Sequence, residues 1–132
     1  MPVALPDHVR VLLSRPSPCV ISTLLPDGSP HATEVWVDVD GDHVLVNSVD
    51  GHRKVGNVRR DPRVALTVLD PDDTSRYVGL RGRVVEITTD GAADHIDKLA
   101  LRYTGRPYQW YGGRDQVRVL LRIEANALLG GF

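Results

Sequence analysis

The sequence predicts a mainly β protein, a small closed barrel of six strands with short helices inserted between them. Three observations predict this class. Short extended segments with apolar residues recur along the chain, turn residues separate them closely, and only three segments have the spacing of a helix. The chain has 132 residues, the length of one domain, and it contains no internal repeat or linker. We therefore predict a single domain over residues 1–132.

The first half of the chain is expected to form one helix and three strands. Pro6-Asp7 begins a short helix, and Arg15-Pro16 ends it because the residue before a proline avoids the helical region. Turn-forming residues then separate the extended segments at Pro26-Asp27-Gly28-Ser29 and Asp40-Gly41-Asp42. We expect strands over residues 20–25, 31–39 and 44–48.

The strand over 31–39 alternates clearly between two faces. One face carries Thr33, Val35, Val37 and Val39, and the other carries Glu34, Trp36 and Asp38. The second face mixes acidic and aromatic side chains, so we expect it to border a partly open groove.

The second half is expected to add two helices and three strands. We predict helices over 52–60 and 91–103, the second with Ile96, Leu99, Ala100 and Tyr103 facing inward. We predict strands over 64–69, 77–88 and 117–123, with an aromatic loop over 104–113 before the last. The strand over 64–69 is apolar at nearly every position, so both of its faces should be covered. Gly79 and Gly82 indicate bends or close backbone approaches in the strand that contains them.

The composition excludes several classes of function. Hydrophobic residues make up 42% and charged residues 25%, and the net charge is −1. This balance does not favour nucleic acid or an anionic membrane as a partner. The longest apolar runs are about six residues, far below a membrane span. The N-terminus lacks the pattern of a secretory signal, and one cysteine cannot form an intrachain disulfide. We expect a cytoplasmic protein.

The interior of so small a barrel should fill with side chains. A large ligand must then bind outside the barrel or between subunits. The sequence suggests one place for it. A strand ending in Asn47-Ser48 leads into a helix that opens with Arg53 and Lys54. A hydroxyl, an amide, two cations and a helix N-terminus together favour a bound phosphate. The alternative is that the basic residues form a solvated helix face.

Other chemistry is not evident in the sequence. The five histidines show no metal-binding spacing, and no nucleophile, P-loop or dinucleotide motif occurs. We assign no metal site and no catalytic residue.

Several segments together resemble a known family. The order PDGSPHATEVW, VLVNS, RKVGNVRRDPRVALTV and LRGRVVEI is similar to the pyridoxamine-5′-phosphate-oxidase-like split β-barrel superfamily. More closely, the chain resembles a subgroup of small actinobacterial oxidoreductases that use the deazaflavin coenzyme F420. The resemblance covers roughly Val20 to Ile123.

The resemblance implies a six-stranded split β-barrel that forms a homodimer with the cofactor in a groove between subunits. The matching phosphate-side positions are Asn47, Ser48, Arg53, Lys54 and Asn57. The positions along the ring system are Val35, Trp36 and Val37. Candidates from the second subunit are Tyr77, Arg81 and the loop Tyr108-Gln109-Trp110.

The implied function is hydride transfer from F420 to an activated double bond of a small molecule, such as an enone or a quinone. The coenzyme itself carries out such chemistry, so a dedicated catalytic acid is not required. Two alternatives stay open: an oxidoreductase that binds flavin mononucleotide (FMN), and a non-enzymatic cofactor- or haem-binding relative.

Overall fold

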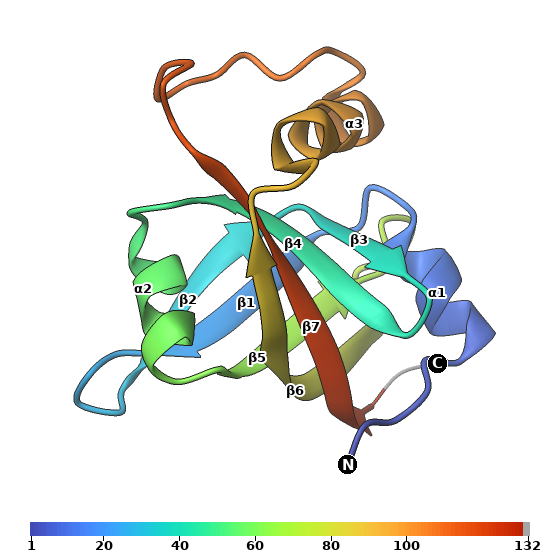
Figure 1. Ribbon diagram of the computed structural model, residues 1–132. Helices are drawn as coiled ribbons and strands as arrows, with labels where there is room; N and C mark the ends of the chain where they lie inside the picture. Colours follow the sequence, from blue (N-terminus) through green and yellow to red (C-terminus); the bar gives the residue numbers. More distant parts are fainter. Residues whose placement is uncertain (131–132) are drawn as a thin grey trace.

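A computed structural model describes residues 1–130 and contains one curled antiparallel sheet with helices around it (Figure 1). The strands are β1 (Cys19–Leu24), β2 (Pro30–Val35), β3 (Val37–Asp40), β4 (His43–Val49), β5 (Arg63–Leu69), β6 (Tyr77–Thr88) and β7 (Arg118–Leu129). The helices are α1 (Asp7–Leu13), α2 (Arg53–Arg60) and α3 (Ala92–Thr104). The order in the sheet is β2-β1-β5-β6-β7-β4-β3. The predicted mainly β split barrel is confirmed, with seven strands instead of six.

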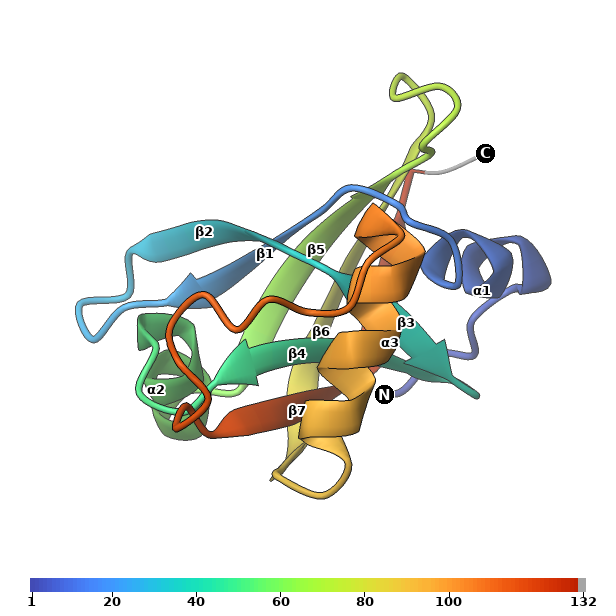
Figure 2. The same cartoon turned by 90° about the horizontal axis from the view of Figure 1, so that it is seen from above.

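The additional strand arises because the segment over 31–39 is two strands and not one. β2 pairs with β1, whereas β3 pairs with β4 at the opposite edge of the sheet. Trp36 alone separates them, so the two edge strands of the sheet are consecutive in the chain (Figure 2). The barrel is therefore closed by a covalent link at Trp36. Alternation alone could not reveal this change of partner, because it continues through the break.

The break leaves backbone groups that need other partners, and α3 supplies them. The Tyr103 hydroxyl accepts a hydrogen bond from the Val37 N–H at 3.1 Å and donates one to the Ser17 carbonyl at 2.8 Å. Arg102 donates to the Val37 carbonyl at 3.3 Å. The Trp36 ring stacks on the Tyr103 ring with centroids 5.3 Å apart. These contacts satisfy buried polar groups that would otherwise destabilise the switch between strands.

Apolar side chains fill the barrel interior, as expected. Fully buried members include Ile21, Val44, Val46, Leu66, Leu80, Leu121 and Ile123. Gly82 lies at a register shift between β6 and β7, where a Cβ would come within 2.0 Å of the Glu124 carbonyl oxygen. The expectation of a close backbone approach at Gly82 is therefore confirmed.

Within this chain one face of β5 is covered, since Val64, Leu66 and Val68 are buried while Thr67 is exposed. That the other face is also covered stays a prediction, because a second subunit would be its cover. One expectation about the strands was wrong: β7 continues to Leu129 and not only to residue 123. Its second half is less regularly apolar, but it pairs with the first half of the long strand β6. Pairing with a neighbour, and not local pattern, sets its length.

The helices cover different parts of the barrel (Figures 1 and 2). α1 buries Val9, Leu12 and Leu13, and α2 lies against β1. α3 lies on the outer side of β3 and β4 and buries Ile96, Leu99 and Ala100, as predicted. No helix among residues 1–130 is long and apolar enough to cross a membrane.

We predict that Tyr103→Phe destabilises the protein by about 1–3 kcal/mol, because it leaves the Val37 N–H and the Ser17 carbonyl without a partner. Urea unfolding at a fixed protein concentration measures this free energy. Tyr111→Phe is the matched control, since the Tyr111 side chain is exposed and its hydroxyl makes no hydrogen bond among the described residues. Equal stability of the two variants would contradict the role given to Tyr103.

Candidate functional site

A cavity of about 220 Å³ lies where the end of β4, the start of α2 and the start of β7 meet. The residues that matter for its chemistry are Trp36, Ser48, His52, Lys54, Tyr108 and Arg118. They come from the strand break, from β4, from α2 and the residue before it, from the aromatic loop and from β7. The pairing of β4 with β7 places Val49 opposite Arg118, which brings these distant segments together.

Two adjacent residues of β4 give the cavity its polar floor. The Asn47 amide nitrogen donates to the Ala92 carbonyl at 2.9 Å, and its oxygen accepts from Arg118 Nε at 2.9 Å. Ser48 is only 3% exposed, and its hydroxyl has no hydrogen-bond partner in the described part of the chain. A buried hydroxyl without a partner is costly, so the Ser48 side chain is suited to a ligand in the cavity.

Lys54 and Arg118 give the cavity positive charge, and the acidic residue Glu34 also lines it. Both side chains are partly buried, and neither makes an ion pair with another described residue. Burial lowers the pKa of Lys54, and the neighbouring Arg118 lowers it further. Burial also lowers the pKa of Arg118. Two partly desolvated cations that repel one another favour an anion between or beside them.

His52 adds a titratable group to the same wall. Burial lowers the pKa of its imidazole, and the charges of Lys54 and Arg118 lower it further. The ring therefore tends to stay neutral while the cavity holds no anion.

Arg118 was not predicted from the sequence as a site residue. Contacts with Asn47 and Tyr108 hold its side chain in place. Its Nε donates to Asn47, and its Nη1 donates to the Tyr108 hydroxyl at 3.2 Å. Its guanidinium also lies over the Tyr108 ring, 5.1 Å from the centroid. Arg118 is distant in sequence from Asn47, and only the pairing of β7 with β4 reveals the contact.

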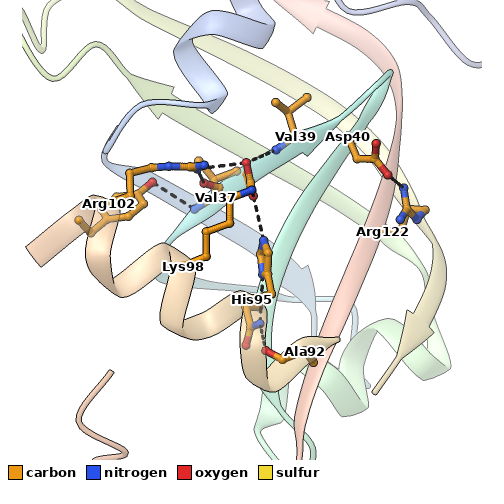
Figure 3. A network of polar contacts seen from close by, with 11 residues as sticks. Val37, Val39, Asp40, Ala92, His95, Lys98, Arg102 and Arg122 are labelled. Carbon is orange, nitrogen blue, oxygen red and sulfur yellow. Dashed lines mark hydrogen bonds and ion pairs between the residues drawn. The ribbon is translucent and has the colours of Figure 1, made fainter. Parts of the chain in front are cut away.

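A second electrostatic centre lies beneath α3, at Asp38 (Figure 3). His95 Nε2 lies 2.9 Å from Asp38 Oδ2, and Arg102 and Lys98 contact the same carboxylate at 3.1 and 3.4 Å. Burial by itself would raise the pKa of Asp38, but hydrogen bonds from His95, the Val39 N–H and Arg102 outweigh it and hold the pKa well below its usual range. The expectation that Asp38 borders an open groove was wrong, because α3 packs over this face.

The structure brings together some of the residues predicted for the site. Val35, Trp36, Asn47, Ser48 and Lys54 all line the cavity.

The other predicted residues lie elsewhere. Val37 is completely buried, and Arg53 is exposed outside the cavity lining. Asn57 faces β1, where its amide donates to the Thr23 hydroxyl at 3.0 Å. Tyr77 and Arg81 are on β6, away from this cavity, and both are exposed.

The aromatic loop forms the outer wall. Tyr108 makes edge-to-face contacts with Trp110 and Tyr111, at 5.5 and 5.7 Å between centroids. A second cavity of about 240 Å³ lies between this loop and the end of α3. Trp36, Tyr108 and Tyr111 line both cavities, so the two spaces adjoin. The arrangement offers a charged end, with Lys54 and Arg118, and an aromatic end.

Comparisons of sequence and of structure with known proteins point to the same family. A family model described as pyridoxamine 5′-phosphate oxidase matches residues 5–129. The solved structure of an F420 reductase is 30% identical to this chain, has a TM-score of 0.81, and the match covers 95% of this chain and 98% of that one. No curated protein sequence matches.

Two further solved structures are similar. The conserved hypothetical protein Rv2991 from Mycobacterium tuberculosis is 29% identical, with a TM-score of 0.66 over 96% of this chain and 84% of that one. The General Stress Protein 26 from Bacillus anthracis is 17% identical, with a TM-score of 0.67 over 92% of this chain and 88% of that one. At that identity, the second likeness concerns the fold alone.

We predict that Asp38→Asn lowers stability by about 3–5 kcal/mol at pH 7, because it removes the partner of three cationic or donor groups beneath α3. The folded pKa of Asp38 lies below its unfolded value, so its contribution is present above the unfolded pKa and is lost as the pH falls. The difference between wild type and variant should therefore shrink below about pH 5.

Urea unfolding at several pH values between 7 and 3 measures this difference. Asp50→Asn is the control, since Asp50 pairs with Arg59 at the surface, where an ion pair contributes little. A stability difference for Asp38→Asn that stays constant over this pH range would contradict the prediction.

Proposed function

Because this chain belongs to the pyridoxamine 5′-phosphate oxidase family, we propose that it is an oxidoreductase that uses the deazaflavin coenzyme F420. The family includes oxidoreductases that bind flavin or deazaflavin coenzymes. Similarity to an F420 reductase over nearly the whole length of both chains supports the deazaflavin. The proposed reaction is hydride transfer to an activated double bond of a small molecule, such as an enone or a quinone.

The observation that carries the proposal is a cavity lined by Lys54 and Arg118, neither of which makes an ion pair with a described residue, and by Ser48, whose hydroxyl has no hydrogen-bond partner there. A phosphate would suit this lining, since it supplies negative charge and several acceptor oxygens. The neutral aromatic wall of Trp36, Tyr108 and Tyr111 then fits a flat ring system. The residues present therefore fit a phosphate-bearing coenzyme with a planar ring.

The bound coenzyme would supply the hydride chemistry, and a deazaflavin favours two-electron transfer over reaction with oxygen. The residues of this chain bind and orient. Lys54, Ser48 and Arg118 would hold the anionic group, and Val35 and Trp36 would lie along the ring. Tyr108 and Tyr111 would exclude water from the space where a substrate enters.

A second candidate function is an oxidoreductase that binds FMN. The match to the pyridoxamine 5′-phosphate oxidase model favours it, and the cationic end of the cavity suits either coenzyme. Direct comparison of the two coenzymes is therefore the decisive experiment.

We also propose a homodimer. The two adjoining cavities, at about 220 and 240 Å³, together reach only the lower part of the roughly 300–1,000 Å³ typical of ligand sites, so a partner's surface would help to enclose a coenzyme as large as F420. The outer face of β2, β1, β5 and β6 offers a contact surface, because small residues lie side by side on the first three of these strands. Ser22 pairs with both Ala32 and Ala65, and Ala65 pairs with Arg81. Tyr77 and Arg81 on β6 would reach the partner's cavity.

We predict that the purified protein binds F420 more tightly than FMN, and that Lys54→Ala weakens F420 binding by about ten- to a hundredfold. Loss of one charge-assisted contact, about 1.5–3 kcal/mol, gives this factor. Fluorescence titration of each coenzyme measures the dissociation constants. Arg59→Ala is the control on the same helix, because Arg59 pairs with Asp50 away from the cavity.

If the protein binds FMN more tightly than F420, FMN is the coenzyme and the second candidate function holds. No binding of either coenzyme, by a protein with a normal melting temperature, would refute the proposed function.

We predict a stable dimer at micromolar concentration, with more than about 2,000 Å² of surface buried in total. Sedimentation equilibrium gives the mass directly, and Ala65→Arg on the exposed face of β5 should produce the monomer. A wild-type species of 14.5 kDa at these concentrations would refute the dimer.

A further inference from the structure

An unbroken chain of hydrogen bonds leads from the cavity to the buried carboxylate beneath α3. Arg118 Nε donates to Asn47 Oδ1 at 2.9 Å, the Asn47 amide lies 3.2 Å from His95 Nδ1, and His95 Nε2 lies 2.9 Å from Asp38 Oδ2. The chain joins four elements, β7, β4, α3 and β3 (Figure 3 shows the His95 end). Asp38 and His95 do not line the cavity themselves.

The contacts allow only one arrangement of protons. Asn47 must present its oxygen to Arg118, which is a donor, and its nitrogen to the Ala92 carbonyl, which is an acceptor. The amide therefore donates to His95 Nδ1, and the imidazole proton lies on Nε2, where it donates to Asp38. Every bond has the same direction, from the guanidinium to the carboxylate, so the bonds polarise and strengthen one another.

Arg118 has N–H donors that no described residue accepts. A guanidinium has five N–H groups, and Asn47 and Tyr108 each accept one. Both of these partners are neutral, although the guanidinium is partly buried. A desolvated cation with neutral partners and free donors at a cavity wall is poised for an anion.

We propose that Arg118 binds the anionic group of the ligand in the cavity, and that Asp38, His95 and Asn47 are positioning residues that fix its guanidinium. This inference rests on the proposed function, under which that group is the coenzyme phosphate. The positioning residues act through orientation, since a planar guanidinium binds a tetrahedral anion well only when its donors are aimed correctly.

The competing explanation is that the chain only attaches α3 to the barrel. Substitution of His95 would then lower stability without changing anion affinity. The two explanations are separated by measuring affinity and stability on the same variants.

The first experiment uses inorganic phosphate as the probe and nuclear magnetic resonance as the readout. Titration of wild type with phosphate should shift the Arg118 Nε–H resonance and give a dissociation constant. Arg118→Gln should raise this constant by about tenfold, and Arg118→Lys should restore part of the loss because it keeps the charge. Arg122→Gln is the matched control four residues later on β7, since Arg122 pairs with Asp40 and Glu86.

The second experiment separates positioning from attachment of α3. A glutamine at position 95 can donate to Asp38 and accept from Asn47, as the imidazole does, whereas a leucine can do neither. His95→Leu should raise the phosphate dissociation constant by about three- to tenfold and move the Arg118 Nε–H resonance before any phosphate is added. His95→Gln should stay within about twofold of wild type.

The outcomes are distinct. Equal phosphate affinity of wild type and Arg118→Gln would overturn the assignment of Arg118. Wild-type phosphate affinity in a folded His95→Leu, with an unchanged Arg118 resonance, would overturn the positioning chain. If His95→Leu does not fold, the test depends on His95→Gln. A loss of phosphate affinity in His95→Gln would contradict the expectation that glutamine replaces both hydrogen bonds of the imidazole. Failure of F420 and FMN to bind, with the phosphate results intact, would refute the proposed function and leave Arg118 as an anion-binding residue.

Discussion

The structure depends on one constraint: the sheet is closed through a single residue, Trp36, whose neighbouring strands pair with opposite edges. Such a switch leaves backbone groups unpaired, and helix α3 is held in place by satisfying them through Tyr103 and Arg102. Once α3 is fixed there, it covers Asp38, and the loop that follows it must pass over Trp36 on its way to β7. The walls of the cavity are thus a consequence of how the barrel closes.

Two groups of charged residues lie on either side of Asn47. The group around Asp38 contains both signs of charge in contact, whereas Lys54 and Arg118 are both cations. Asp38 is surrounded by His95, Lys98 and Arg102, so its buried charge is more than balanced. Lys54 and Arg118 make no ion pair with a carboxylate in residues 1–130, so their charge would favour an anionic ligand. Compared with well-packed apolar residues, a complete buried ion pair adds little stability, although removing one partner is costly, and such a pair can fix the geometry around it. In our proposal Asp38 orients the Arg118 guanidinium, because His95 and Asn47 connect the two side chains by hydrogen bonds.

Local patterns predicted most of the fold and about half of the cavity. The hairpins, all three helices and the filled interior followed from alternation, turn residues and chain length. Ser48 and Lys54 could be found because strand end and helix start are adjacent in sequence. Arg118 and His95 could not be found in this way, since each meets Asn47 only through the pairing of β7 with β4 or the packing of α3. The prediction for Asn57 was wrong in the other direction. Its place in a basic motif suggested that it binds the phosphate, but its amide donates a hydrogen bond to the Thr23 hydroxyl within the chain.

Under the proposed function, the cationic end of the cavity would bind the phosphate of the coenzyme and the aromatic end would bind its ring. A cationic pair suits any phosphate, so the charged end cannot separate a flavin from a deazaflavin. At the other end, one face of Trp36 is already stacked on Tyr103, so only its other face and its edges can meet a ring. If the protein binds one of these coenzymes, we expect Val35, Trp36 and the aromatic loop, or the surface of a partner subunit, to distinguish between them. A substitution at Lys54 measures whether an anion binds, whereas a substitution at Trp36 measures which ring is accepted.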